Sequence, residues 1–375
     1  MTKCKITGIE IQRFRGIYQA RVENLTDVNF LVGKNGAGKS TILEAFYIAS
    51  RWVKKDDVIL EGYDKVDRVL QRRGERGYWS RDRNSLWFNA ETVHPIIVEL
   101  VFSSGKNLKV ALPYSKDHNF KDVVLDIADA PEIARRNVPK GYLTGYYSFV
   151  EGKLYRQDLA CYTRLNYVRE ALVDYYSDEI HFLKGITLVD SQVLSRRSIL
   201  EKNIWNIVKR RRLDKTIVKV LREGYEESIE GITFLPTGEG RAQLGVELSN
   251  AAIRIDDLGD GTRIAADIMA MMSITRDSCM LLEDPEVHQH PGGLYRLTEA
   301  ILKMSKENNV QLIVTTHSIE LLKMASEIAK DLSIEVSFFF VERNEKGIVN
   351  VRRFDKVDMD VLEKIGLDPR FMYLI

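Results

Sequence analysis

Residues 33–41 read Gly33-Lys-Asn-Gly-Ala-Gly-Lys-Ser-Thr41. They fit the pattern G-x-x-x-x-G-K-[ST] of a phosphate-binding loop. The glycines let consecutive backbone N–H groups turn inward around an anion, and the helix that follows adds its positive N-terminal end. In this pattern Lys39 reaches the β- and γ-phosphates of a nucleotide and Ser40 holds a magnesium ion. The residues expected to bind phosphate are Gly33, Asn35, Gly36, Ala37, Gly38, Lys39, Ser40 and Thr41.

The neighbours of this loop favour a strand before it and a helix after it. Residues 29–32 are a short apolar run typical of a buried strand, and residues 41–50 contain no helix breaker. Charged residues dominate 51–91 and predict a mobile loop with some helix. Antiparallel strand pairs are predicted by alternating patterns over residues 5–11 with 18–24, and 94–102 with 107–112.

The rest of the chain alternates predicted strands with predicted helices. This order predicts an α/β fold with a largely parallel central sheet. Short strands are also expected at 232–235 and 243–248. Buried strands are expected at residues 185–192, 279–282, 311–314 and 334–341.

Net charge, cysteine spacing and apolar runs bear on the class of protein to different degrees. The net charge of +1 gives no argument for or against nucleic acid. Cys4, Cys161 and Cys279 lie far apart and form no C-x-x-C, so neither a zinc site nor a redox pair is predicted. The N-terminus lacks an apolar signal core, and no apolar run approaches the ~20 residues of a membrane span. The sequence predicts a cytoplasmic protein without a membrane partner.

A carboxylate pair, Glu283-Asp284, follows the predicted strand 279–282. The carboxyl ends of strands in open α/β sheets are where ligands bind. An acid there can hold magnesium through water, and a second acid can orient an attacking water. The alternative is a solvated acidic cluster at a strand end.

His317 follows the predicted strand 311–314 in the same way. An imidazole at this position can hydrogen-bond a γ-phosphate and respond to its presence. The alternative is a histidine that caps the next helix.

A Gly-rich turn, Leu258-Gly-Asp-Gly-Thr-Arg263, precedes another predicted helix. Its amides and the helix N-terminus would form a second anion site. Because the phosphate loop already serves this chain's own nucleotide, a second site suggests contact with a partner's nucleotide, and hence a homodimer. The residues concerned are Gly259, Asp260, Gly261 and Arg263; the alternative is a plain turn.

The order of these motifs resembles ABC-type ATPase heads, in particular the branch that contains RecF, the SMC-like ATPases and the OLD (overcoming lysogenization defect) family. Glu283-Asp-Pro-Glu-Val-His-Gln-His-Pro291 is similar to the E-[ED]-P-E-x-H-L-H-P stretch of OLD-like ATPases, and Ile9-Glu-Ile-Gln-Arg-Phe-Arg-Gly16 also resembles theirs. The similarity covers about residues 4–50 and 230–345. It implies a P-loop NTPase head with an antiparallel β-subdomain, built from residues 1–116 and 231–375, with a mixed, mostly helical insertion at 117–230.

The resemblance implies ATP and Mg²⁺ as cofactors and a role for each motif. Glu283 stands at the magnesium-binding acid and Asp284 at the catalytic acid, while His317 would be the switch histidine. Gly259-Asp-Gly261 would be the signature loop that reaches the other subunit's γ-phosphate. Gln192 is the candidate Q-loop glutamine and magnesium ligand, with Gln71 and Gln157 as alternatives.

This sequence departs from the family pattern at several points. Gly259 replaces the usual signature serine, and the usual Asp-Glu order is reversed, so a shorter base at Asp284 predicts slow hydrolysis. No sustained heptads predict a long coiled coil. Too few residues follow His317 for the Toprim nuclease module of full OLD proteins, and Asp358-Met-Asp360 is taken as a chance D-x-D.

Three functions remain open. The first is an ATPase whose dimer acts as a switch in DNA maintenance or in defence against mobile elements. The second is an ATP-gated scaffold for a separate effector, a nuclease or toxin, suggested by the unmatched residues 51–230. A transporter subunit is opposed by the missing LSGGQ signature. The basic helix predicted at 196–223 can contact DNA or be a solvated face.

Overall fold

The computed structural model describes residues 4–72, 78–114, 124–125, 175–238 and 241–354. Within these residues, one sheet of eleven strands runs through the molecule in the order β6-β5-β4-β1-β2-β14-β13-β3-β12-β11-β7. A separate three-stranded sheet has the order β10-β9-β8. The predicted α/β class is therefore confirmed.

Five neighbouring strands of the large sheet are parallel, and they form its buried half. Every residue of β3 and of β12 is buried, which is the burial expected of a sheet covered on both faces. The pairs β13–β3, β3–β12, β12–β11 and β11–β7 all run in the same direction. The strands are β13 (Val336–Arg343), β3 (Val28–Val32), β12 (Val310–Thr316), β11 (Ser278–Glu283) and β7 (Thr187–Val189).

The other half of the sheet is mostly antiparallel. The hairpin predicted before the phosphate loop is confirmed, with β1 (Ile6–Phe14) paired to β2 (Ile17–Glu23). Further strands follow on both sides: β4 (Ile96–Phe102), β5 (Asn107–Leu112) and β6 (Val124–Leu125) beyond β1, and β14 (Ile348–Phe354) between β2 and β13.

Helices cover the parallel strands on both faces, and the strands alternate their side chains between two cores. In β12, for example, Ile313 joins one core and Leu312 with Val314 joins the other. The first core holds the apolar side chains of α1 (Lys39–Ala49) and α2 (Lys65–Gln71). The second holds those of α12 (Asp260–Ile274), α13 (Pro291–Asn308) and α14 (Ile319–Leu332).

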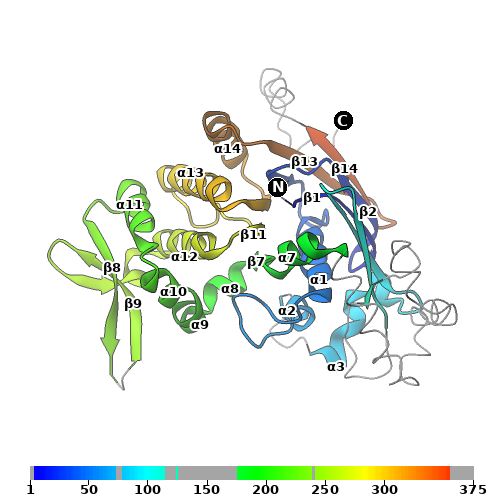
Figure 1. The fold of residues 1–375 in the computed structure, drawn as a ribbon, viewed down its shortest axis with the longest axis horizontal. Coiled ribbons are helices and arrows are strands. Elements are labelled where there is room, and N and C mark those ends of the chain that lie inside the picture. Colours follow the sequence, from blue (N-terminus) through cyan, green and yellow to red (C-terminus); the bar gives the residue numbers. More distant parts are fainter. Residues whose placement is uncertain (1–3, 73–77, 115–123, 126–174, 239–240, 355–375) are drawn as a thin grey trace.

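A lobe of short helices and the three-stranded sheet lies at one end of the molecule, away from β1 and β2 (Figure 1). The single basic helix predicted over 196–223 is wrong. The chain is broken into α8 (Ser191–Ser195), α9 (Arg197–Leu200), a π-helical turn (Glu201–Trp205), α10 (Asn206–Arg210) and α11 (Asp214–Gly224). The break after α10 occurs at Arg212, whose positive φ of 54° ends the helix. The sheet of this lobe consists of β8 (Ile229–Thr237), β9 (Arg241–Leu248) and β10 (Ala252–Arg254).

The prediction of a mobile charged loop is wrong for much of residues 51–72, because several of the charged side chains there are buried. Arg51, Asp57, Lys65 and Arg68 each expose 5% or less of their surface. A short 3-10 helix, Ser50–Trp52, begins this segment. Three short helices come after it: α3 (Trp79–Asp82), Arg83–Leu86 and Phe88–Ala90. A further short helix, Ile255–Leu258, precedes α12.

Several predicted boundaries also shift. The strand predicted at 185–192 ends at Val189, because Asp190 caps α8 by accepting a hydrogen bond from Val193 N. The helix predicted at 41–50 begins at Lys39, directly after the loop. Cys161, Gln157 and Asp358-Met-Asp360 lie outside the described residues.

Candidate functional site

The carboxyl ends of the five parallel strands meet at one edge of the sheet. Val32 pairs with Thr316 and with Phe340, Glu283 pairs with Thr315, and Leu282 pairs with Val189. The residues that end or follow these strands are Gly33, Glu283, Asp284, His317, Asp190 and Arg343. This is the position at which open α/β sheets bind ligands.

A cavity of about 430 Å³ lies at this edge, which is large enough for a nucleotide. The predicted phosphate-loop residues, except Gly33, and the three predicted catalytic residues line it together. Its lining consists of Gly16, Asn35, Gly36, Ala37, Gly38, Lys39, Ser40, Thr41, Glu44, Arg72, Glu283, Asp284, His317 and Arg343.

The backbone of the phosphate loop explains two of its glycines. A Cβ on Gly33 would lie 2.2 Å from the carbonyl oxygen of Val341, so only glycine lets the loop pass this close to β13. Gly38 adopts a φ of 106° where α1 begins, a conformation that L side chains rarely take. The loop thereby turns directly into the N-terminus of α1, whose free N–H groups attract anions.

Lys39 is held inside the loop. Its Nζ donates to the carbonyl oxygen of Gly33 at 2.7 Å and lies 3.1 Å from Nε2 of His317. Burial lowers the pKa of Lys39, against the opposing effect of the nearby carboxylates of Asp284, Glu286 and Glu283. A phosphate in the cavity would place further negative charge beside this ammonium group.

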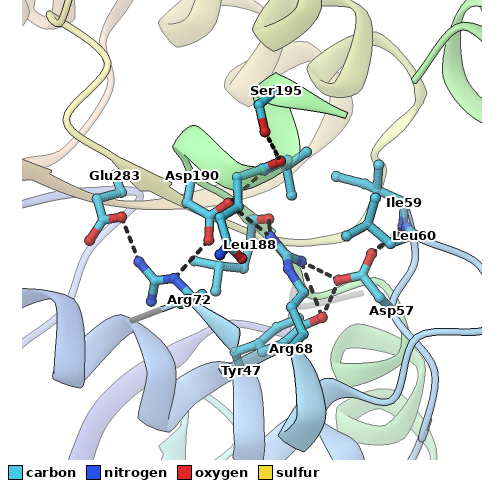
Figure 2. A network of polar contacts seen from close by, with 12 residues as sticks. Tyr47, Asp57, Ile59, Leu60, Arg68, Arg72, Leu188, Asp190, Ser195 and Glu283 are labelled. Carbon is cyan, nitrogen blue, oxygen red and sulfur yellow. Dashed lines mark hydrogen bonds and ion pairs between the residues drawn. The ribbon is translucent and has the colours of Figure 1, made fainter. Parts of the chain in front are cut away.

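The two acids at the end of β11 have different surroundings. Oδ1 of Asp284 accepts a hydrogen bond from the Thr315 hydroxyl at 3.1 Å, which fixes the carboxylate at the cavity wall. Oε2 of Glu283 forms an ion pair with Arg72. Figure 2 shows Arg72 between Glu283 and Asp190. The carboxylates are therefore held separately, one by a hydroxyl and the other by a guanidinium.

His317 is positioned from its backbone. Oε1 of Glu286 accepts from His317 N at 2.8 Å and from the Thr316 hydroxyl at 2.7 Å. The alternative that His317 caps α14 is wrong, because the Ser318 side chain accepts from Leu321 N and caps that helix. The imidazole instead lines the cavity beside Lys39.

The residues at this edge fit a magnesium ion that arrives with phosphate. Ser40 and Glu283 both line the cavity, and hydroxyl and carboxylate oxygens are the hard ligands that magnesium prefers. Among the described residues, no group of three or more His, Cys, Asp or Glu side chains could hold a metal on its own. Two protein ligands fit magnesium, which usually completes its coordination with phosphate oxygens and water.

The predicted signature loop, residues 258–263, does not line this cavity. Gly259 has a φ of 97° with no atom within 4 Å of the place of a Cβ, so the loop's backbone favours glycine where the family pattern has serine. Gly261 packs on the carbonyl of His288, where a Cβ would come within 2.5 Å. Arg263 donates to Leu194 O at 2.9 Å and pairs with Asp260.

Gln192 also lies outside the cavity lining. It sits in the first turn of α8, and its amide nitrogen donates to the carbonyl of Gln71 at 2.7 Å. Its role as the Q-loop glutamine stays a prediction.

Sequence reasoning missed four residues of the cavity: Gly16, Glu44, Arg72 and Arg343. A signal existed for Glu44, because it is the single charged side chain in the apolar helix 41–50. Arg72 shares a helix face with Lys65 and Arg68, a stripe that is more often solvated. Glu286 was within a quoted motif but had no assigned role.

The chain is similar to several known proteins. The chain is 18% identical over 361 residues to an ATP/GTP phosphatase of Helicobacter pylori, a match that covers 92% of this chain and 94% of that protein. It is 38% identical over 79 residues to the DNA replication and repair protein RecF of Photorhabdus laumondii, covering 19% of this chain and 22% of that protein. The SMC head domain from Thermotoga maritima aligns over 94% of this chain and 99% of that chain, with 15% identity and a TM-score of 0.45.

No helix in the described part of the chain is long and apolar enough to cross a membrane. The model of the AAA ATPase domain matches residues 5–73 and 181–322, more than half of the chain. These two segments hold the phosphate loop, Arg72, Glu283, Asp284 and His317. The chain belongs to the AAA ATPase domain family.

Proposed function

We propose that the protein binds and slowly hydrolyses ATP, and that two copies enclose the nucleotide in a dimer that acts as a conformational switch. The observation that carries this proposal is the cavity at the strand ends. It joins the phosphate loop, two acids and a histidine, while the predicted signature loop lies outside it. This arrangement supports a hydrolytic half-site in each copy, with the loop at residues 258–263 left to bind an anion elsewhere.

Each cavity residue has a role in this reaction. Lys39 and the loop amides bind the phosphates, and Ser40 with Glu283 holds magnesium, which neutralises charge on the phosphates when bound. Asp284 orients the attacking water. His317, 3.1 Å from Lys39, contacts the γ-phosphate and responds to its loss. The short Asp284 side chain is tied to Thr315, which suits slow turnover.

The second copy would supply residues 258–263 to the site. Gly259 and Asp260 are exposed at the start of α12, so a partner's triphosphate can approach them. The phosphate loop and the signature loop then complete each other across a two-fold axis.

The proposed biology is DNA maintenance or defence against mobile elements, in the cytoplasm, as a stand-alone member of the OLD/RecF/SMC-like branch. The short RecF similarity and the motif Glu283–Pro291 support this assignment.

The test is ATP turnover with purified wild type, Lys39→Ala and Asp284→Ala. We expect both variants to lose about 10²-fold or more in turnover. Asp284→Ala should retain nucleotide binding, whereas Lys39→Ala should lose it. Equal rates in all three proteins would sink the proposal.

A second candidate is an ATP-gated scaffold for a separate effector. The lobe formed by α8–α11 and β8–β10 favours it, because this lobe extends away from the β1–β2 end of the molecule (Figure 1). Pull-downs with and without a non-hydrolysable ATP analogue distinguish the two. A partner retained only with the analogue, at unchanged low turnover, would favour the scaffold; no partner in either state would remove it.

Contact with DNA is the remaining partner proposal. Five exposed cations lie around the break between α10 and α11: Lys202, Arg210, Arg211, Arg212 and Lys215. Changing Arg210, Arg211 and Arg212 to Ala should weaken DNA binding and reduce its salt dependence. The control replaces the exposed Lys303, Lys323 and Lys330 of α13 and α14, and equal losses in both triple variants would argue against a specific surface.

A further inference from the structure

Three charged residues line the cavity without a part in the chemistry described above, and two of them, Glu44 and Arg72, have buried side chains. Glu44 lies one helical turn after Ser40 in α1 and is fully buried. Arg72 directly follows α2, and only 6% of its side chain is exposed. Buried charges at a binding site call for a specific partner, because removing them from water is costly.

Arg72 is held on three sides by carboxylates. Its Nε pairs with Oδ2 of Asp190 at 2.7 Å, one terminal nitrogen pairs with Oε1 of Glu44 at 2.8 Å, and the other pairs with Oε2 of Glu283. Two of these three pairs appear in Figure 2. Glu44 is also paired with Arg15 at 2.6 Å, and Asp190 lies near Arg68 at 3.5 Å. Glu283, by contrast, has Arg72 as its ion-pair partner and is the more exposed carboxylate, at 18%.

The ion pair conflicts with the role proposed for Glu283. A magnesium ion on this carboxylate would stand within a few ångströms of the guanidinium, and two cations at that range repel strongly away from bulk water. A triphosphate changes the balance, because its negative charges attract both cations. The guanidinium can then leave Glu283 while Glu44 and Asp190 still hold it at the cavity wall.

We propose that Arg72 is a positioning residue that occupies Glu283 and keeps magnesium off this carboxylate until a nucleotide triphosphate enters the cavity. Metal and nucleotide therefore bind together, and magnesium alone binds weakly. The inference rests on the proposed role of Glu283 as the magnesium-binding acid.

The test measures binding of Mn²⁺, a spectroscopic substitute for Mg²⁺, to the nucleotide-free protein. We expect weak binding to wild type and about tenfold tighter binding to Arg72→Gln, with Arg72→Lys between them. The gain should vanish in Arg72→Gln/Glu283→Gln. Arg343→Gln is the matched control, because Arg343 lines the same cavity but contacts the carbonyl of Gly16.

A second measurement has its main outcome in wild type, so that outcome does not depend on the folding of any variant. Metal and a non-hydrolysable ATP analogue must each strengthen binding of the other by the same factor, about tenfold or more, and this factor should shrink in Arg72→Gln. Mn²⁺ affinity in wild type that is equal with and without the analogue overturns the inference. Unchanged or weaker Mn²⁺ binding in Arg72→Gln also overturns the inference, because Arg72 would then hold Glu283 in place without competing with the metal. ATP turnover that persists beside either result would leave the ATPase proposal standing.

Discussion

The cavity at the strand ends and the signature loop at the start of α12 are both anion sites by sequence, yet the fold treats them differently. The cavity draws most of its residues from four strands or the segments after them, and its charged residues Lys39, Glu44 and Arg72 have buried side chains. Residues 258–263 are outside it, and Asp260 is exposed. Parallel strands bring their carboxyl ends together within one chain, whereas in the described part of the chain the predicted signature loop does not line the cavity at that edge.

Under the proposed function, one copy supplies the phosphate loop, the acids and the histidine of its own site, and the predicted signature loop would serve the nucleotide of a second copy. The comparison therefore predicts that each site needs residues from two copies.

Mixing two inactive variants should give the largest change. Lys39→Ala removes the lysine of the phosphate loop and Gly259→Asp places a carboxylate on the predicted signature loop, so each alone should lose about 10²–10³-fold in turnover. Mixed in equal amounts, they should recover about a quarter of wild-type activity, because half of the dimers contain one intact composite site. The measurement is the ATP turnover of the mixture after the subunits of the two variants have exchanged. Recovery would also show that Gly259→Asp folds. If both variants are folded and dimeric and activity does not recover, residues 258–263 of one copy do not complete the site of the other.

His317→Ala should come next. Losing the imidazole beside Lys39 should lower turnover by roughly 10²-fold and change ATP affinity little, since the phosphate loop remains. Single-turnover kinetics with a binding titration separate the two quantities. His181→Ala, an exposed change in α7 (Ser177–Lys184), is the control. A loss confined to affinity would mean that His317 serves binding and not hydrolysis.

Thr315→Val should have a smaller effect on the same half-site. It removes the hydroxyl that holds Asp284, and the loss of one hydrogen bond of about 1 kcal/mol predicts roughly a fivefold fall in turnover. Thr298→Val is the matched control, because the Thr298 hydroxyl bonds to Leu294 O within α13. Equal effects of the two changes would show that Asp284 does not depend on Thr315.

Lys65 is a fully buried cation that donates to the Ser50 hydroxyl at 2.6 Å, and it should make the stability of the fold depend on pH. Burial lowers the pKa of Lys65 from 10.5 to about 7. Between these values the unfolded chain binds a proton that the folded chain lacks. The free energy of unfolding should therefore rise with pH, by up to about 1.4 kcal/mol per unit.

Denaturant unfolding at pH 7 and pH 9 checks this prediction. Lys65→Met should lose the added slope, and it should gain stability relative to wild type most at pH 7 and below. The exposed Lys54→Met should keep the wild-type slope. The same slope in all three proteins would show that groups other than Lys65 cause the pH dependence of the free energy of unfolding.

The sequence foresaw much of this edge because its signals are local. A phosphate loop needs glycines, a lysine and a serine at fixed spacing, so residues 33–41 carried their own evidence. Glu283, Asp284 and His317 were found because each follows an apolar run whose end could be placed within a residue or two. Two predicted elements were wrong in extent. The strand predicted to end at Gln192 stops earlier because Asp190 caps α8, and the basic helix predicted over 196–223 is broken at Arg212. Neither effect is visible in the periodicity of apolar residues.

The sequence by itself determined the α/β class, the phosphate loop and the identity of the acids and histidine at the strand ends. Only the tertiary structure decided which of these groups meet in one cavity, and that Arg72 joins them. The physical reason is range: backbone geometry and apolar periodicity act over a few residues, whereas the pairs of Arg72 with Glu44, Asp190 and Glu283 span segments far apart in the chain. Such pairs exist only after the sheet has set its strand order, and no local pattern encodes that order.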